Sequence, residues 1–212
     1  MNTLSACRKS SLALVVLAGA MLLSGAPASA APEARSGMLV ATAAWAGSVE
    51  LQASRNPKWR GMYARYSASG GWRVLADKVA DIRAAPRDEL LEKVNDLVNR
   101  ARQVSDRRNW QSGDYWAVPI ELFNRGGDCE DFAIAKYLLL RELGVPSSHM
   151  QILITRDHAV LVVRDEEGLV VLDSLRSRTY QLSPSQAARA VFALNEKSWW
   201  VNTGGARQVA AR

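Results

Sequence analysis

Apolar residues recur at helical spacing in the stretch that follows Pro86. The positions that share one face are Leu90, Leu91, Val94, Leu97, Val98, Ala101 and Val104. Spacings of three and four residues place side chains on the same side of an α-helix. Asp88 and Glu89 lie in the first turn, where the helix dipole favours acidic side chains. The pattern predicts an amphipathic helix over about residues 88–104.

A second helix is predicted to begin at Asp128. Asp128 suits the N-cap position, and Asp131, three residues later, can complete a capping box. The apolar positions on one face of this helix are Phe132, Ala135, Leu139 and Leu143. Gly144, followed by Pro146, is expected to end it. Residues 105–127, between the two helices, are polar and aromatic and are expected to form mostly loop.

The hydrophobic period then changes from helical to strand-like. Residues 150–155, 158–164 and 169–172 are rich in Ile, Val and Leu, and residues 165–168 read as a four-residue hairpin turn. A short helix is expected over 183–192, followed by an aromatic segment at Trp199-Trp200. A helix followed by antiparallel strands predicts the α+β class.

The remaining segments complete the domain organisation. Residues 31–56 read as a loosely ordered lead-in with one short strand near Val49 to Leu51, and residues 57–212 read as one domain. Trp59, Tyr63 and Trp72 are expected to pack at the edge of that domain.

The first thirty residues resemble a secretory signal peptide. A basic region at Arg8 and Lys9 precedes the apolar stretch 12–23, and Ala28-Ser29-Ala30 suits cleavage after Ala30. The sequence therefore predicts an exported, periplasmic protein that does not span the membrane once the signal is removed. Cleavage lowers the formal net charge from +6 to +4, because Arg8 and Lys9 are lost without any acidic residue. No basic run interleaved with aromatics is present, so nucleic acid is not an expected partner.

Cys129 is the one cysteine of the mature chain, since Cys7 leaves with the signal peptide. A single thiol in an oxidising compartment is a liability unless it is buried or used. At the first turn of a helix the dipole and the backbone N–H groups stabilise a thiolate, which is the nucleophilic form. Gly126 and Gly127 permit tight turns and are expected to leave room for a substrate chain. The structural alternative is a small apolar residue packed at a helix start.

The acids beside this cysteine, Asp128 and Glu130, oppose a thiolate, because neighbouring carboxylates raise the pKa of a thiol. A cation must then offset them, either a protonated histidine or a bound metal. The mature chain has two histidines, His149 and His158. His149 follows Pro146-Ser147-Ser148 and is expected to be a solvated loop residue.

A register argument selects His158 as the candidate base. If residues 165–168 form the turn, Arg164 pairs with Leu169, and His158 lies diagonally across from Asp173 on the same face. An imidazole and a carboxylate so placed are the base and orienter of a nucleophilic triad. Cys129, His158 and Asp173 are therefore the predicted catalytic residues. A one-residue slip of the hairpin would put the pair on opposite faces.

Several motifs together resemble the bacterial transglutaminase-like cysteine proteinases, which include the LapG-type periplasmic proteases. They are "GDYWAVPIELFNRGGDCEDFAIAKYLLLRELGVP", "DHAVLVV" and "VVLDSL", followed by Asn195 and Trp199. The similarity runs from about Val94 to Trp200. It implies a papain-like or transglutaminase-like core, in which the cysteine-bearing helix packs on an antiparallel β-sheet. Cys129, His158 and Asp173 match the triad of that family.

The resemblance also implies a cofactor and partners. LapG-type members bind calcium through acids that flank the cysteine, here Asp128, Glu130 and Asp131. Such proteases cut large surface adhesins under the control of an inner-membrane cyclic di-GMP receptor. The family often has asparagine after the triad aspartate, whereas this chain has Ser174, so the surroundings of Asp173 are expected to differ. If the acids bind no metal, Asp128 and Asp131 serve as helix caps.

Peptide-bond hydrolysis is the leading interpretation of these residues, and two alternatives remain. The same triad suits a transglutaminase or amidase, in which an amine or a wall peptide replaces water or the adhesin. A non-catalytic calcium-binding module is the second alternative, although it would have no need of all three triad residues.

Overall fold

The computed structural model describes residues 39, 45, 47–111, 113–166 and 168–203. The signal peptide predicted for residues 1–30, and most of the predicted lead-in, lie outside these residues. The strand expected near Val49 to Leu51 is confirmed as β1, Ser48–Gln52.

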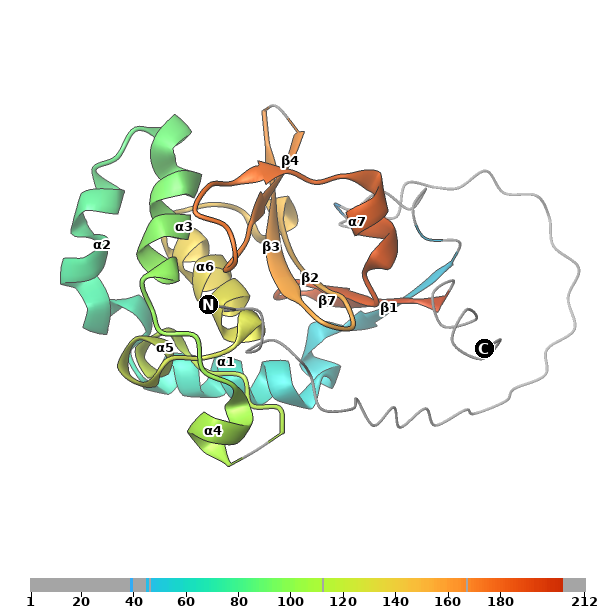
Figure 1. The fold of residues 1–212 in the computed structure, drawn as a ribbon, viewed down its shortest axis with the longest axis horizontal. Helices are drawn as coiled ribbons and strands as arrows, with labels where there is room; N and C mark the ends of the chain where they lie inside the picture. The colour runs from blue at the N-terminus through green and yellow to red at the C-terminus, as the bar shows by residue number, and fades with distance from the viewer. Residues whose placement is uncertain (1–38, 40–44, 46, 112, 167, 204–212) are drawn as a thin grey trace, which may run out of the picture.

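A single antiparallel sheet of seven strands forms one half of the fold (Figure 1). After β1, the strands are β2 (Met150–Ile154), β3 (Ala159–Asp165), β4 (Gly168–Leu172), β5 (Tyr180–Gln181), β6 (Phe192–Leu194) and β7 (Ser198–Asn202). Their order in the sheet is β1-β7-β6-β2-β3-β4-β5. The predicted α+β class, with a transglutaminase-like arrangement of helix and antiparallel sheet, is confirmed.

The described residues form seven α-helices, most of which share the core on one face of the sheet, while the last lies against the other face (Figure 1). They are α1 (Pro57–Ala68), α2 (Ala76–Arg83), α3 (Leu90–Asn99), α4 (Asp106–Trp110), α5 (Pro119–Arg125), α6 (Cys129–Glu142) and α7 (Pro184–Arg189). Short 3₁₀ turns are η2 (Ala53–Arg55), η3 (Gly71–Leu75), η4 (Arg87–Glu89) and η5 (Ser147–His149). Trp45 also lies on the α7 side, since it donates its indole N–H to the carbonyl of Ala187 at 2.9 Å. The Leu39 N–H donates to Oε1 of Gln151 in β2 at 3.1 Å.

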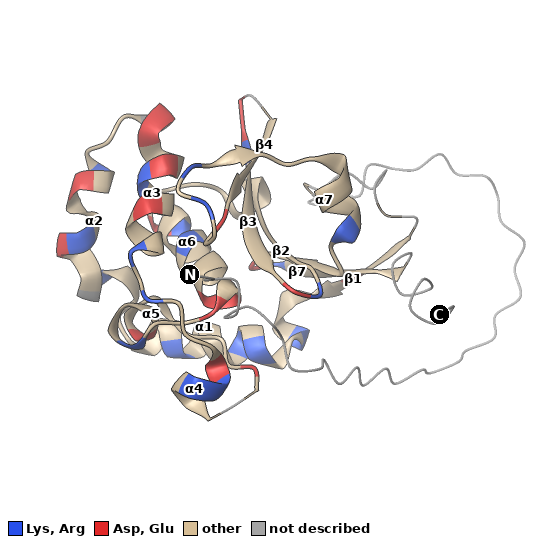
Figure 2. Cartoon of the chain, in the orientation of Figure 1, with Lys and Arg blue, Asp and Glu red and all other residues tan. Residues whose placement is uncertain are grey.

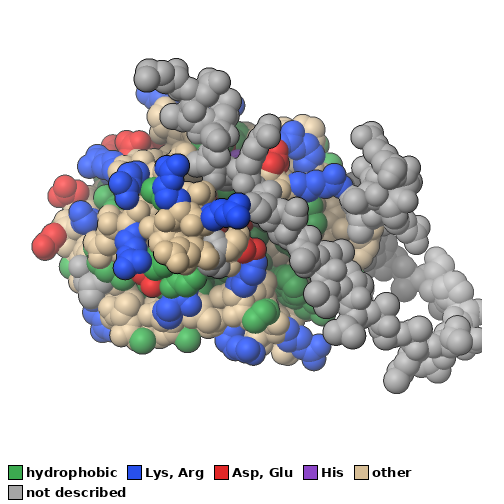
Figure 3. Space-filling view, turned by 60° about the horizontal axis from the view of Figure 1, so that its bottom comes forward, with side chains coloured by type: hydrophobic (Ala, Val, Ile, Leu, Met, Phe, Trp, Pro, Cys, Tyr) green, Lys and Arg blue, Asp and Glu red, His purple; other side chains and the backbone are tan. Residues whose placement is uncertain are grey.

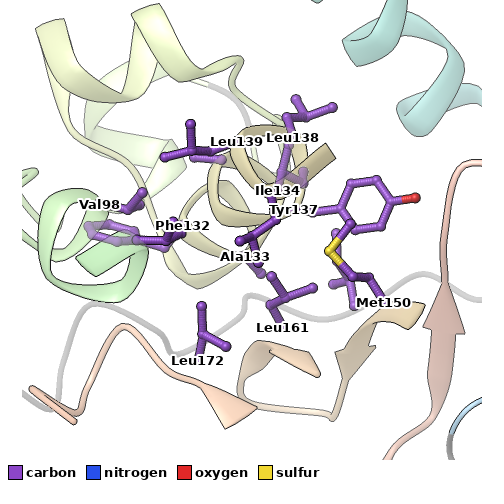
Figure 4. Packing of buried hydrophobic residues seen from close by; sticks show 14 of the residues in the cluster. Val98, Phe132, Ala133, Ile134, Tyr137, Leu138, Leu139, Met150, Leu161 and Leu172 are labelled. Atoms are coloured by element: carbon purple, nitrogen blue, oxygen red, sulfur yellow. The ribbon is translucent and has the colours of Figure 1, made fainter. Parts of the chain in front are cut away.

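The main core is the interface between α6 and the sheet (Figure 4). Every residue from Cys129 to Leu140 is buried, because α6 is enclosed by α3, α5 and the strands β2 and β3. Along β3, Leu161 and Val163 face this core while Val162 faces the α7 side, as the period of a strand requires. Each such Leu or Val contributes about 1.5–3 kcal/mol by leaving water. The cysteine-bearing helix is therefore enclosed by the core along most of its length.

Two predictions along the first half of the chain need correction. The helix predicted to reach Val104 ends at Asn99, because residues 103 and 104 leave it to join the chain at Gly127. The Val104 N–H donates to the Gly127 carbonyl at 2.9 Å. The predicted loop 105–127 contains the helices α4 and α5, too short for their periodicity to be recognised.

The aromatic residues of the first half are also placed differently from the prediction. Trp59 and Trp72 are not at the edge of the domain but in the main core, with 3% and 1% of their surface exposed. Tyr63 is 40% exposed. Trp59 packs edge-on against Tyr137 of α6 with ring centroids 5.7 Å apart, so α1 is fixed directly on the cysteine-bearing helix.

Later elements follow the sequence prediction more closely. Gly144 has a φ of 89° and ends α6 in the left-handed region that favours glycine. The helix expected over 183–192 is shorter, because Phe192 already belongs to β6.

Basic side chains on the face shown in Figure 3 form separate groups and not one continuous patch.

Candidate active site

Cys129 is the first residue of α6 and is 4% exposed. The predicted capping box before it is confirmed. The Asp128 carboxylate accepts from the Glu130 N–H at 3.3 Å, and the Asp131 carboxylate accepts from the Asp128 N–H at 3.1 Å. Sγ of Cys129 lies 2.9 Å from Oε2 of Glu130. The sulfur therefore lies at the positive end of a helix and in contact with an acid.

Gly126 and Gly127 have a different role from the one expected. Gly126 has a φ of 83°, and a Cβ at this position would approach the Arg102 carbonyl oxygen to 2.4 Å. A Cβ on Gly127 would lie 2.2 Å from Oδ2 of Asp131. The space beside these glycines is thus filled by Arg102 and Asp131, and it is not left for a substrate. Gly127 allows the Asp131 carboxylate to reach back to the start of the helix.

The predicted hairpin register is confirmed, and it brings His158 and Asp173 together. Arg164 pairs with Leu169 across β3 and β4. His158 comes directly before β3 and Asp173 directly after β4, with His158 Nε2 and Asp173 Oδ1 2.7 Å apart. The turn itself is tighter than expected, because Asp165 and Gly168 are already a pair of the ladder.

The packing of α6 on β3 relates this pair to the cysteine. Ala133, one turn after Cys129, and Leu161, three residues after His158, belong to one core cluster and lie next to each other in Figure 4. Further along both elements, Tyr137 of α6 lies next to Met150 in Figure 4, and Met150 pairs with Val163 of β3, so α6 and β3 run in the same direction. The start of α6 and the start of β3 therefore lie at the same end of the helix–sheet interface. His149, at the end of η5, is exposed, as expected.

Asp173 is enclosed by donors and is 5% exposed. Its Oδ1 accepts from the Leu175 N–H at 2.9 Å as well as facing His158, and its Oδ2 accepts from the Tyr180 hydroxyl at 3.1 Å. Burial acts to raise the pKa of Asp173, but the hydrogen bonds from His158 and the Leu175 N–H outweigh it and lower that pKa from its ordinary value. Asp173 is therefore held as a carboxylate.

A polar stripe on α3 and just beyond it holds the segment that carries Asp173. Asn99 donates to the Asp173 carbonyl at 3.0 Å, and Gln103 donates to the Ser174 carbonyl at 3.0 Å. The fully buried Asn95 donates to the Arg176 carbonyl at 3.0 Å. These side-chain amides hold the backbone after β4 in place by hydrogen bonds. The sequence pattern of α3 predicted its apolar face and gave no sign of this polar contact.

Four acidic side chains gather at the first turn of α6. Carboxylate oxygens of Asp106, Asp128 and Asp131 lie within 4.8 Å of one another, and so do the ligand atoms of Asp128, Cys129 and Glu130. Figure 2 shows the acidic residues at the start of α4 and the first turn of α6. Asp106 is 22 positions before Asp128, and no spacing in the sequence points to it. The structure thus adds a fourth acid to the three that the sequence singled out.

Burial and mutual repulsion make this group costly to ionise. Burial, opposed in part by the Tyr115 N–H, raises the pKa of Asp106 to about 6. Burial and the neighbouring Glu130 and Asp131 raise the pKa of Asp128, and burial also raises that of Asp131. Hard cations such as Ca²⁺ prefer several carboxylate and carbonyl oxygens and would remove the repulsion. The four acids therefore have the chemistry of a cation site.

Lys136 is a further buried charge that the sequence reading missed. It lies on α6 two turns after Cys129, is fully buried, and its Nζ has no hydrogen-bond partner among the described residues. Burial lowers the pKa of Lys136 to about 7, against the opposing attraction of Asp173. Its position seven residues after the cysteine could have drawn attention, because that spacing selects the same face of a helix.

Membrane insertion finds no support in the described ranges, where every helix is too short or too polar to cross a bilayer.

Comparison with known proteins identifies the family. The sequence model of the bacterial transglutaminase-like cysteine proteinases (BTLCP) matches residues 71–202. Among curated proteins, none matches at a significant level.

Solved structures of LapG from Legionella pneumophila are also similar to the chain. The calcium-bound form has 34% identity over 59% of this chain and 74% of that one, with a TM-score of 0.49. The EGTA-treated form has the same identity and TM-score over 72% of its length, and a third LapG structure has 32% identity over 78%, again at 0.49. The family match spans α6, the β3–β4 hairpin and the last strand, and the chain belongs to the bacterial transglutaminase-like cysteine proteinases, a family of cysteine peptidases.

Proposed function

We propose that Cys129, His158 and Asp173 are the nucleophile, base and orienter of this cysteine peptidase. The observation that carries the proposal is the 2.7 Å contact between His158 Nε2 and Asp173 Oδ1, at the end of the sheet that faces the start of α6. A helix-start thiol, an imidazole and an ionised carboxylate supply the three roles of a nucleophilic triad.

The reaction proceeds through an acyl-enzyme. Nε2 of His158 is engaged with Asp173, so Nδ1 is the nitrogen that exchanges protons with the thiol and the leaving group. The Cys129 thiolate attacks the carbonyl carbon of the scissile peptide, and the imidazolium protonates the leaving amine as the C–N bond breaks. Water then attacks the thioester and gives a proton to His158, and the carboxylic acid and the Cys129 thiolate are released, which restores the thiolate–imidazolium pair. Asp173 holds the ring and stabilises its charged form.

Asp106, Asp128, Glu130 and Asp131 are proposed to hold a Ca²⁺ ion. Their oxygens lie close together, three of the four acids are at most 5% exposed, and their charges repel. Solvent cannot screen these buried negative charges, so a bound cation is needed to neutralise them. When bound, it would neutralise the acids next to the sulfur. Glu130, whose Oε2 lies 2.9 Å from the Cys129 sulfur, would then oppose thiolate formation less.

We also propose export to the periplasm, a large surface adhesin as the substrate, and control by a cyclic di-GMP receptor. Export rests on the signal-like residues 1–30. The substrate and the receptor rest on the motifs that resemble LapG-type proteases. Together they describe an enzyme that releases surface proteins in response to an internal signal.

The test is cleavage by the mature chain, residues 31–212, of surface proteins stripped from a Gram-negative envelope. Mass spectrometry would identify new N-termini, with Cys129→Ala as the control. This substitution replaces one small helix-start residue by another, so folding should persist while all cleavage stops. Cleavage that survives in the variant contradicts the proposal. A glutamine peptide and a primary amine, added together, separate the alternatives, because an isopeptide product would indicate acyl transfer instead of hydrolysis.

A further inference from the structure

Tyr180 contacts the Asp173 carboxylate from the side opposite to His158. Two donors, His158 and the Leu175 N–H, face Oδ1, whereas the Tyr180 hydroxyl lies 3.1 Å from Oδ2. The terminal torsion of an aspartate is soft, so donors on one oxygen alone leave the carboxylate able to rotate. A donor on the second oxygen fixes the plane of the group.

The direction of the Tyr180 hydroxyl proton is set by Gln186. Oε1 of Gln186 accepts from the Ser183 N–H at 3.1 Å and from the Ser183 hydroxyl at 2.9 Å, which leaves Nε2 facing Tyr180. Nε2 donates to the tyrosine oxygen at 3.3 Å. Since that oxygen accepts from Gln186, its own proton is directed to Asp173.

Tyr180 is well suited to remain a donor. Its backbone is fixed by β5, where Tyr180 pairs with Val171 two residues before Asp173. Burial, together with the nearby Asp173, raises the pKa of Tyr180 to about 12, so the hydroxyl keeps its proton at neutral pH. Tyr180 also lines a pocket of about 470 Å³ with Gln186 and residues 176–179.

We infer that Tyr180 is a positioning residue of the triad, which fixes the Asp173 carboxylate through Oδ2 so that Oδ1 aligns the imidazole of His158. The inference rests on the proposed triad. A buried carboxylate oxygen that loses its donor is left unsatisfied, and the group rotates toward other partners. Through Gln186, the start of α7 is linked to the same carboxylate.

The experiment compares Tyr180→Phe with Tyr137→Phe in the mature chain. Tyr137 is a matched control, because its hydroxyl accepts one hydrogen bond, from the Glu196 N–H at 3.0 Å, and makes no contact with the His158–Asp173 pair in the described structure. Both variants keep the ring and lose one hydroxyl. The readouts are the rate of Cys129 alkylation by iodoacetamide from pH 5 to 10, and the melting temperature.

Tyr180→Phe should slow alkylation at neutral pH by about tenfold, since a hydrogen bond to a charged group contributes about that factor. The pH of half-maximal alkylation should move upward, because a poorly oriented imidazolium supports the thiolate less. Tyr137→Phe should lower the melting temperature and leave the alkylation profile unchanged. A profile of Tyr180→Phe that superimposes on that of the unsubstituted chain, or an equal shift in both variants, overturns the inference.

Asp173→Asn separates this inference from the proposed function. If Asp173→Asn shifts the alkylation profile and Tyr180→Phe does not, the triad stands and only the role of Tyr180 fails. If neither Asp173→Asn nor His158→Ala changes alkylation, the triad itself is refuted, and the inference about Tyr180 falls with it.

Discussion

Asp106 offers the sharpest test of the acidic cluster at the first turn of α6, because Asp106→Asn should stabilise the calcium-free chain and weaken its response to calcium. The substitution removes one negative charge and keeps an oxygen that can still accept from the Tyr115 N–H. Asp106 is 5% exposed, so its charge is poorly screened by water. Asp81→Asn, at an exposed position of α2, is the control for simple loss of charge.

The magnitude follows from the pKa of Asp106, which rises from 3.8 to about 6 in the folded chain. A folded-state pKa above the unfolded one means that the folded chain binds the proton more tightly. The stabilisation is present in full below pH 3.8 and is lost as the pH rises through 6. At neutral pH the ionised group therefore costs about 3 kcal/mol relative to a neutral one. For a domain of this size, that corresponds to roughly 6–12 °C in melting temperature.

In excess chelator, Asp106→Asn should thus raise the melting temperature at pH 7.5, and much less at pH 4, where Asp106 is largely protonated. Titration with calcium should then stabilise the variant less than the unsubstituted chain, for which saturation at 100 times Kd adds about 2.7 kcal/mol. Differential scanning fluorimetry measures the melting temperature in chelator and its increase on addition of calcium. A lower melting temperature in chelator, or an equal response to calcium, would refute the reasoning.

Three further substitutions test neighbouring parts of the site. Gly127→Ala should lower the melting temperature and any calcium-induced stabilisation, because the new Cβ would lie 2.2 Å from Oδ2 of Asp131. Circular dichroism during heating measures the melting temperature, and an unchanged value would mean that the turn relaxes around the new methyl group. Lys136→Met should raise the free energy of unfolding in urea titrations by about 1–4 kcal/mol, because it removes a buried charge that has no hydrogen-bond partner in the described residues. A less stable variant would show that other groups offset the cost of burying the Lys136 charge. Asp173→Asn should lower kcat by about 10- to 100-fold, since a hydrogen bond between charged groups contributes about 1.5–3 kcal/mol, and it should lower the melting temperature much less. Unchanged turnover would exclude Asp173 from the triad.

Features that depend on local spacing could be predicted from the amino-acid sequence. Asp128 and Asp131 predicted the start of α6, because a capping box joins residues three positions apart. The pairing of Arg164 with Leu169 predicted the contact of His158 with Asp173, because a short turn fixes the register of both strands. The family motifs lie in these same segments. Fold class and the proposed triad were therefore accessible without a structure.

Which distant polar groups meet depends on how the helices and the sheet pack together. Asp106 joins the acids of α6 because α4 folds back over the start of that helix, and Tyr180 reaches Asp173 because β5 adds to the edge of β4. Trp59 is in the core because α1 packs on α6, whereas its surrounding sequence suggested an edge. Such contacts join residues far apart in the chain, and their free energy appears only when helix and sheet close around a common core. Hydrophobic periodicity indicates which face of an element is buried. It does not indicate which other elements that face contacts, or which partners the neighbouring polar residues find.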